Sequence, residues 1–186
     1  MIVVINATRK PAPSVQGNSA TRTLLNNALE KVTPHYDSFK YYDIRDMDLP
    51  FFDARETKLY NSLDLNNLLT DLVKAKGVFL GVPGYWSGVS GCFKNLIDLI
   101  CGAHYDSLEP ETVLKGKYFA GFSVGTDNLT TLRTAEQTYS ILVSTGALPA
   151  ERIIPIPNPR SASFDLETSE ILILNALVQL IKSIEL

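Results

Sequence analysis

The chain has 186 residues, of which 45% are hydrophobic, so we expect one globular domain with a core of its own. A net charge of −3 gives no electrostatic basis for binding nucleic acid, and no apolar run reaches the roughly 20 residues that span a membrane. Two cysteines provide neither a disulfide framework nor a four-ligand metal site, and the apolar start lacks the basic residues of a secretion signal, so we expect a soluble cytoplasmic protein without a metal.

Short apolar runs typical of buried strands alternate along the chain with segments of helical periodicity. Strands are predicted at 2–7, 38–44, 77–82, 118–122 and 153–156, and helices at 24–32, 65–72, 93–100, 132–143 and 171–184. Prolines at 155, 157 and 159 are expected to end the fifth strand. The alternation predicts a single α/β domain over residues 1–186, with a five-stranded parallel sheet of order 2-1-3-4-5 and helices on both faces. This is the three-layer, flavodoxin-like arrangement.

The loop after the first strand has the composition of an anion site. Thr8 and Arg9 precede a predicted helix start that contains Ser19 and Thr21. A helix start offers free N–H groups and partial positive charge to a phosphate, and hydroxyls and a guanidinium add donors. The simpler interpretation is that Ser19 only caps the helix. The glycine-rich dinucleotide fingerprint and the P-loop motif are both missing.

Two further loops follow the third and fourth strands and should lie side by side at the same sheet edge. The first reads Pro83-Gly84-Tyr85-Trp86-Ser87-Gly88-Val89-Ser90 and the second begins Ser123-Val124-Gly125. Aromatic rings offer stacking surface, and glycines allow a flat ligand to approach the backbone closely. The alternative for the first of these loops is a glycine-rich turn with rings at a subunit interface.

No acid–base pair is recognisable in the sequence. We expect His35 and His104 at the surface, and the acidic residues between positions 43 and 53 in a solvated loop. Such a site, with binding groups but no catalytic side chains, is typical of a cofactor that carries the chemistry itself.

The stretch Pro83–Asp98 resembles the motif P-E-Y-N-x-x-x-P-G-x-L-K-N-x-I-D of the NADPH-dependent FMN reductase family, over sixteen positions without a gap. Tyr42–Pro50 also resembles the family segment D-L-R-D-x-x-L-P. The resemblance implies noncovalent FMN, hydride supplied by NADPH or NADH, and ping-pong transfer of two electrons. The acceptor would be a small molecule such as a quinone, an azo dye, a flavin or a metal oxyanion, and the assembly a homodimer or homotetramer.

The resemblance also implies which residues contact FMN. These are Thr8, Arg9, Ser19 and Thr21 at the phosphate; Pro83, Gly84, Tyr85, Trp86 and Ser87 around the flavin and ribityl chain; and Ser123, Val124 and Gly125 beside the ring. It implies no catalytic side chain, because the flavin carries the chemistry. The segment 10–18 is longer than its family counterpart, Gly84 replaces the usual Glu, and Trp86 replaces the usual Asn.

Two other functions remain open from the sequence. One is a one-electron carrier of the flavodoxin type, which the modest net charge does not favour. The other is a binding protein that has kept the fold and lost FMN, an interpretation that the altered first loop supports. The mostly apolar helix 171–184 is expected to pack on the sheet or to contribute to a subunit interface.

Overall fold

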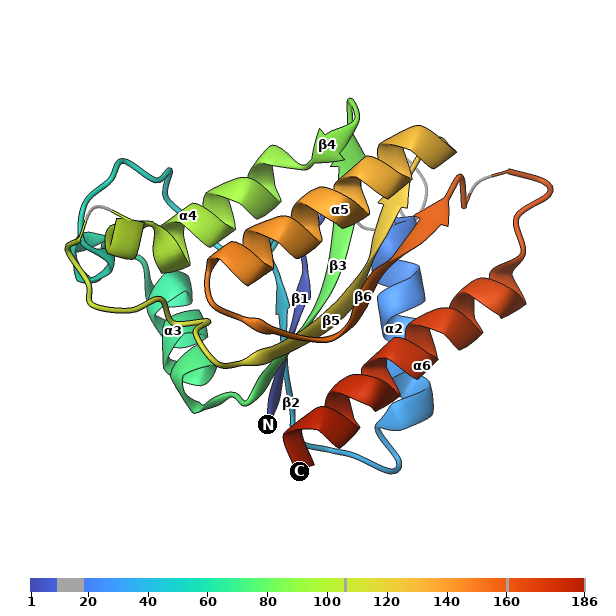
Figure 1. Cartoon of the computed structure of the whole chain (residues 1–186), viewed down its shortest axis with the longest axis horizontal. Coiled ribbons are helices and arrows are strands. Elements are labelled where there is room, and N and C mark those ends of the chain that lie inside the picture. Colours follow the sequence, from blue (N-terminus) through green and yellow to red (C-terminus); the bar gives the residue numbers. More distant parts are fainter. Residues whose placement is uncertain (10–18, 106, 160, 186) are drawn as a thin grey trace.

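The computed structural model describes residues 1–9, 19–105, 107–159 and 161–185, and its centre is one parallel sheet (Figure 1). The strands are β1 (Ile2–Asn6), β2 (Phe39–Asp43), β3 (Gly77–Tyr85), β5 (Tyr118–Gly125) and β6 (Leu148–Pro157). They lie in the order β2-β1-β3-β5-β6, and each neighbouring pair is parallel. The predicted order 2-1-3-4-5 is therefore confirmed.

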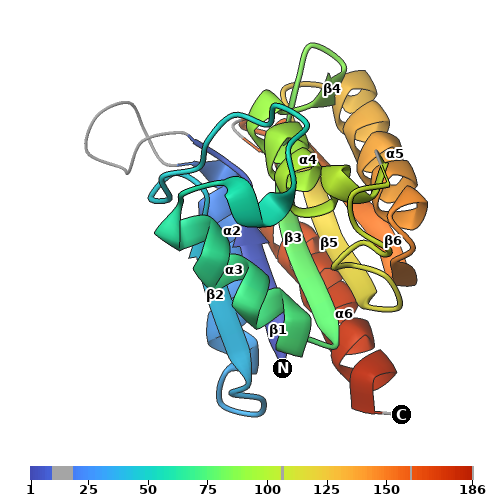
Figure 2. The same cartoon turned by 90° about the vertical axis from the view of Figure 1, so that its left-hand side faces the viewer.

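Helices cover both faces of this sheet (Figure 2). One layer consists of α2 (Ala20–Val32) and α6 (Leu166–Glu185); the other consists of α3 (Leu63–Lys74), α4 (Gly91–Tyr105) and α5 (Asn128–Ser144). A short 3-10 helix, η1 (Thr57–Leu59), precedes α3. No helix in the described ranges has both the length and the apolar character that crossing a bilayer requires.

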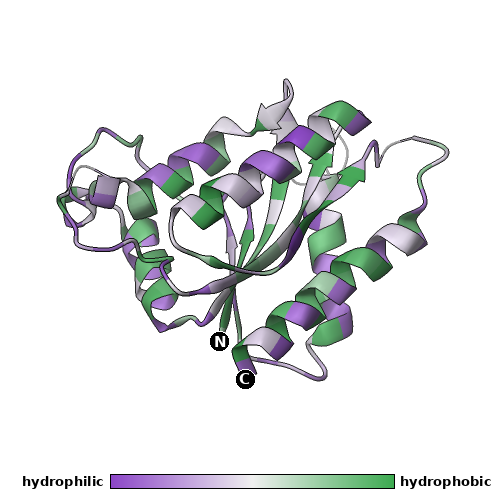
Figure 3. Cartoon of the chain, in the orientation of Figure 1, coloured by the Kyte–Doolittle hydropathy of each residue, from purple (hydrophilic) through white to green (hydrophobic). Residues whose placement is uncertain are grey.

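The apolar side chains of β1 alternate between the two layers. Ile2 and Val4 pack with α2 and α6, whereas Val3 and Ile5 pack with α3 and α4. Because both faces of a central parallel strand are buried, its sequence is a continuous apolar run, as the central strands in Figure 3 show. All five strands of the parallel sheet end at one edge, and this edge positions the site described below.

The last strand differs from its prediction. β6 begins at Leu148 and continues through Pro155 and Pro157, which pair in register with Ser123 and Gly125 of β5. The prediction that these prolines end the strand was wrong. β6 is an edge strand, and proline is tolerated there because its missing N–H would face away from the sheet.

The segment after β3 forms a hairpin where the sequence predicted a loop. β3 extends to Tyr85 and pairs antiparallel with β4 (Gly88–Val89). The two connecting residues, Trp86 and Ser87, have φ angles of 51° and 62°. Positive φ at both central residues is the type I′ geometry of a two-residue hairpin.

The buried face of α5 is composed mainly of threonines, which lie there with Ala135 and Leu142. Leu132 and Val143 are 49% and 43% exposed, whereas Thr131 and Thr134 are fully buried. A Cβ built on Gly84 would lie 2.3 Å from Oγ1 of Thr134, and one on Gly125 would lie 2.4 Å from Oγ1 of Thr131. The helix therefore packs directly on the backbone of β3 and β5, and only compact side chains fit between them.

The lack of space for a side chain at Gly84 gives a first testable prediction. Gly84→Ala should destabilise the fold by about 1–3 kcal/mol, because its methyl group overlaps the Thr134 hydroxyl. The cost should be smaller in a Thr134→Ala background, and urea unfolding of the four proteins of this cycle measures the coupling. Gly91→Ala is the matched control, since nothing lies within 4 Å of its Cβ position. Equal costs of Gly84→Ala in both backgrounds would contradict this account.

Contacts between α2 and α6 give a second prediction. Glu170 of α6 accepts hydrogen bonds from Asn27 and Lys31 of α2, each at 2.6 Å. Lys31, and then Asn27, lowers the pKa of Glu170 in the folded protein. The stabilisation is therefore present above the pKa of the unfolded chain and is lost as the pH falls through the folded value.

Glu170→Gln should accordingly cost about 1 kcal/mol at pH 7 and almost nothing well below the lowered pKa. The measurement is urea unfolding of both proteins at pH 7 and at strongly acidic pH, with Glu136→Gln on the exposed face of α5 as control. A gap between Glu170→Gln and the parent that does not change with pH would show that the charge is irrelevant.

Candidate functional site

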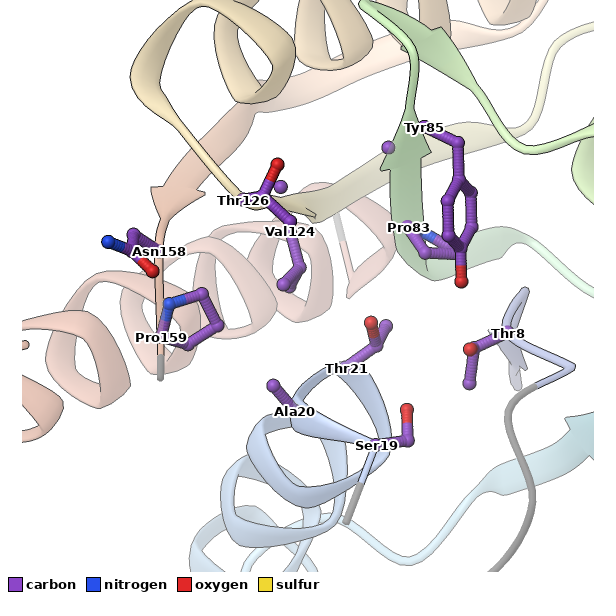
Figure 4. Close-up of a pocket in the computed structure, with 12 residues that line it drawn as sticks. Thr8, Ser19, Ala20, Thr21, Pro83, Tyr85, Val124, Thr126, Asn158 and Pro159 are labelled. Carbon is purple, nitrogen blue, oxygen red and sulfur yellow. The ribbon is translucent and has the colours of Figure 1, made fainter. Parts of the chain in front are cut away.

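A cleft of about 80 Å³ lies where the carboxyl ends of β1, β3, β5 and β6 meet the start of α2 (Figure 4). It is lined by Thr8, Ser19, Ala20, Thr21, Pro83, Gly84, Tyr85, Val124, Gly125, Thr126, Asn158 and Pro159. None of these residues is charged, and hydroxyls gather at the α2 end. This is the edge at which the sequence placed its three candidate loops.

The α2 end of the cleft combines buried hydroxyls with a helix start. Thr8, Ser19 and Thr21 are 1%, 3% and 3% exposed. Ser19 is the N-cap of α2, and its Oγ accepts a hydrogen bond from the N–H of Arg22 at 3.4 Å. The N–H groups of Ala20 and Thr21 lie in the first turn, where amides have no carbonyl partner in their own helix. Ser19 thus both caps the helix and lines the cleft, so its two interpretations are compatible.

The opposite side of the cleft comes from β5, β6 and the aromatic hairpin. The N–H of Asn158 donates to the carbonyl of Gly125 at 2.8 Å, which joins the ends of β5 and β6. The ring of Tyr85 lies beside Pro83 at the end of β3 (Figure 4). Sequence reasoning missed Asn158 and Pro159, although they directly follow the last strand. The rule that parallel strands end at one edge would have found them.

Four predicted site residues lie outside this cleft. Arg9 and Trp86 line an adjoining groove, and Ser87 is half-buried in the hairpin turn. Ser123 is fully buried, and its hydroxyl donates to the carbonyl of Thr131 in α5 at 3.0 Å, away from the cleft. The lengthened segment 10–18 is outside the described residues. The other predicted residues, Thr8, Ser19, Thr21, Pro83, Gly84, Tyr85, Val124 and Gly125, all line the cleft.

A buried polar cluster fixes the first turn of α2. Asp43, at the end of β2, accepts hydrogen bonds from Asn6 at 2.8 Å and from Nε of Arg22 at 2.7 Å. The hydrogen bond to Asp43 raises the pKa of Arg22, so the guanidinium stays charged. The expectation that Asp43 belongs to a solvated loop was wrong, because the carboxylate is only 9% exposed and both partners come from distant segments. The cluster ties the helix start to β1 and β2.

The structure contains few groups for acid–base or metal chemistry. His35 and His104 are exposed, as predicted. Among the described residues, no three His, Cys, Asp or Glu side chains come close enough together to hold a metal ion. Burial raises the pKa of the Cys101 thiol to about 12, so this cysteine stays protonated and unreactive near neutral pH.

Known structures share this architecture along nearly the whole chain. The apo form of the NADH:FMN oxidoreductase EMOB is 20% identical with a TM-score of 0.69, over 98% of this chain and 88% of its own. The NAD(P)H:(acceptor) oxidoreductase FerB from Paracoccus denitrificans is 16% identical with a TM-score of 0.69, and the match covers 99% of this chain and 96% of FerB. Flavodoxin 1 from Bacillus cereus is 14% identical with a TM-score of 0.59, and the match covers 97% of this chain and 96% of the flavodoxin. At these identities the likeness establishes the flavodoxin-like fold.

The family comes from a comparison of the sequence itself. No curated protein matches this chain. The sequence model for NADPH-dependent FMN reductases, however, matches residues 2–158, which include every strand of the sheet and every described residue that lines the cleft except Pro159. The chain belongs to the NADPH-dependent FMN reductase family.

Proposed function

We propose that this protein binds FMN in the cleft and uses it to oxidise NADPH or NADH and to reduce a small acceptor in ping-pong turnover. The observation that carries the proposal is the convergence of three buried hydroxyls and a helix start with the ring of Tyr85, at one sheet edge. Family membership supports the reductase over a simple electron carrier.

The α2 end of the cleft fits a phosphate. Hydroxyls of Thr8, Ser19 and Thr21 and the first-turn amides of α2 are donors, and the helix start carries partial positive charge. The described residues that line the cleft include no carboxylate that would repel an anion. We propose that Arg9, at the neighbouring groove, adds its guanidinium to this set.

The other end of the cleft fits a planar ring. Tyr85 offers an aromatic face, while Val124 and the backbone of Gly84 and Gly125 form an uncharged wall. FMN, when bound, supplies reversible two-electron chemistry, so the surrounding residues need only hold the ring, orient it and limit its contact with water. A site in which FMN supplies the redox chemistry and the protein only binds and orients it needs no acid–base pair of side chains.

We also propose that the protein is a homodimer or homotetramer. Tyr105 on α4, Leu132 on α5 and Ile171 on α6 are 90%, 49% and 49% exposed, and such apolar residues favour a contact between subunits. Light scattering at micromolar concentration should give two or four times the chain mass of 20.5 kDa. Monomers alone at that concentration would refute this part of the proposal.

The cofactor proposal predicts a specific effect at Thr21. Its methyl group faces Gly81 in the core, while its hydroxyl points into the cleft (Figure 4), so Thr21→Val preserves the packing and removes only the donor. The Kd for FMN, from quenching of flavin fluorescence, should rise about tenfold because a charge-assisted hydrogen bond is lost. The Kd for riboflavin, which has no phosphate, should not change.

Thr23→Val is the matched control, because Thr23 lies on the same helix with an exposed side chain. An equal loss of FMN and riboflavin affinity in Thr21→Val would place the phosphate elsewhere. A parent protein that quenches neither flavin and oxidises neither NADPH nor NADH in the presence of added FMN would rule out the proposed function as a whole.

A further inference from the structure

A second concave region, a groove of about 810 Å³, opens beside the cleft. Pro83 and Tyr85 line both, so the groove and the cleft are continuous across these two residues. One wall of the groove is the segment 44–51 after β2, and the other is the hairpin that connects β3 and β4. A molecule in this groove would therefore lie next to whatever occupies the cleft.

Three aromatic side chains face this groove with much of their surface exposed. Phe51 is 88% exposed, Trp86 is 99% exposed and Tyr85 is 44% exposed. Trp86 also has a φ of 51°, in a left-handed region that bulky residues rarely adopt and where a hairpin ordinarily has Asn or Gly. Because the exposed ring makes little packing contact, the strained backbone at Trp86 does not serve the stability of the fold. Strain of this kind together with an exposed aromatic ring is typical of a binding surface.

Asn95 holds the segment that carries Phe51. Its Nδ2 donates to the carbonyl of Pro50, and its Oδ1 accepts from the N–H of Phe52, each at 2.9 Å. One side chain of α4 thus bonds the backbone on both sides of Phe51. Near the start of α4, Oγ of Ser90 accepts from the N–H of Phe93 at 3.2 Å, which secures the first turn. Phe51 is exposed, but its backbone is fixed.

The scarcity of charged residues in the groove indicates which class of ligand it can bind. Among the described residues that line it, Arg9 is the single charged one, and the phosphate proposal assigns it to the cleft. Around Phe51 and Trp86 the lining is otherwise aromatic, aliphatic or neutral. This surface complements a flat, uncharged ring system, which stacks on aromatic side chains, better than a hydrated ion.

We propose that the groove receives the electron acceptor as a flat aromatic ring against Phe51, Tyr85 and Trp86, and that Asn95 is a positioning residue for this contact. The inference rests on the proposed function, because the acceptor needs a reduced flavin beside it. For a quinone, the two electrons and one proton come from the reduced anionic flavin and a second proton from solvent. The products are a hydroquinone and oxidised FMN.

Trp86 itself provides the test, because it is the only tryptophan in the chain. The oxidised holoprotein is titrated with 2-methyl-1,4-naphthoquinone without NAD(P)H, so that no turnover occurs, and tryptophan fluorescence is followed with correction for absorbance. We expect saturable quenching. Phe51→Ala should raise the Kd for the quinone about tenfold, because one stacking partner is lost.

Asn95→Ala should weaken quinone binding similarly, because it releases the backbone around Phe51. Asn95→Asp keeps the acceptor for the Phe52 N–H and loses the donor to Pro50, so we expect an intermediate Kd. Val73→Ala is the control: Val73 is an apolar residue of α3 that is 69% exposed and lies outside the groove, so the Kd should not change. In turnover, the KM for the quinone should rise in Phe51→Ala while the rate with ferricyanide, which needs no stacking, stays the same.

Three results would overturn the inference. Quenching that rises linearly and equally in all variants would show only collisions with an exposed ring. A matching loss of FMN affinity in Phe51→Ala would assign the groove to the cofactor. A matching slowing of flavin reduction by NADPH would assign it to the nicotinamide. Failure of the parent protein to bind FMN is visible before any quinone is added, so it tests the proposed function separately.

Discussion

The close packing of α5 on β3 and β5 determines the geometry of both the cleft and the groove. Thr131 and Thr134 occupy the space that side chains at Gly125 and Gly84 would need. The Thr134 hydroxyl also lies 3.1 Å from the carbonyl of Gly88, and Gln137 of the same helix accepts from the N–H of Val89 at 3.0 Å. One helix face therefore fixes the wall of the cleft and the hairpin that presents Trp86. A side chain at Gly84 would disturb both.

The opposite walls depend on polar side chains that bond to backbone or to each other. Asp43 joins the first turn of α2 to β1, and Asn95 joins α4 to the segment around Phe51. Because a buried carboxylate without a partner is costly and would repel a phosphate, Arg22 is needed beside Asp43 on both counts. The uncharged lining of the cleft is thus obtained by neutralising a nearby charge within the protein rather than by excluding charge from the region.

The sequence predicts local features of this molecule well and long-range contacts poorly. Buried parallel strands are recognisable as apolar runs, and the order 2-1-3-4-5 places their loops at one edge, which located most of the cleft. The threonine face of α5 was not predictable, because its partners Gly84 and Gly125 are distant in sequence and nothing in the helix itself marks them. Pro155 and Pro157 were misinterpreted for a related reason: whether a strand tolerates proline depends on its being at the edge.

Two of the departures from the family motif, Gly84 and Trp86, have different physical consequences although they are two residues apart. Gly84 faces α5, so its effect on a ligand is indirect and passes through the position of the hairpin. Trp86 lies in the turn of that hairpin, where its ring is 99% exposed at the groove. A change at Gly84 should therefore alter stability and both ligand sites together, whereas a change at Trp86 should alter only what binds in the groove. Asn95 lies in Gly91–Asp98, where the match to the family motif is firmest, and its two hydrogen bonds hold the segment around Phe51.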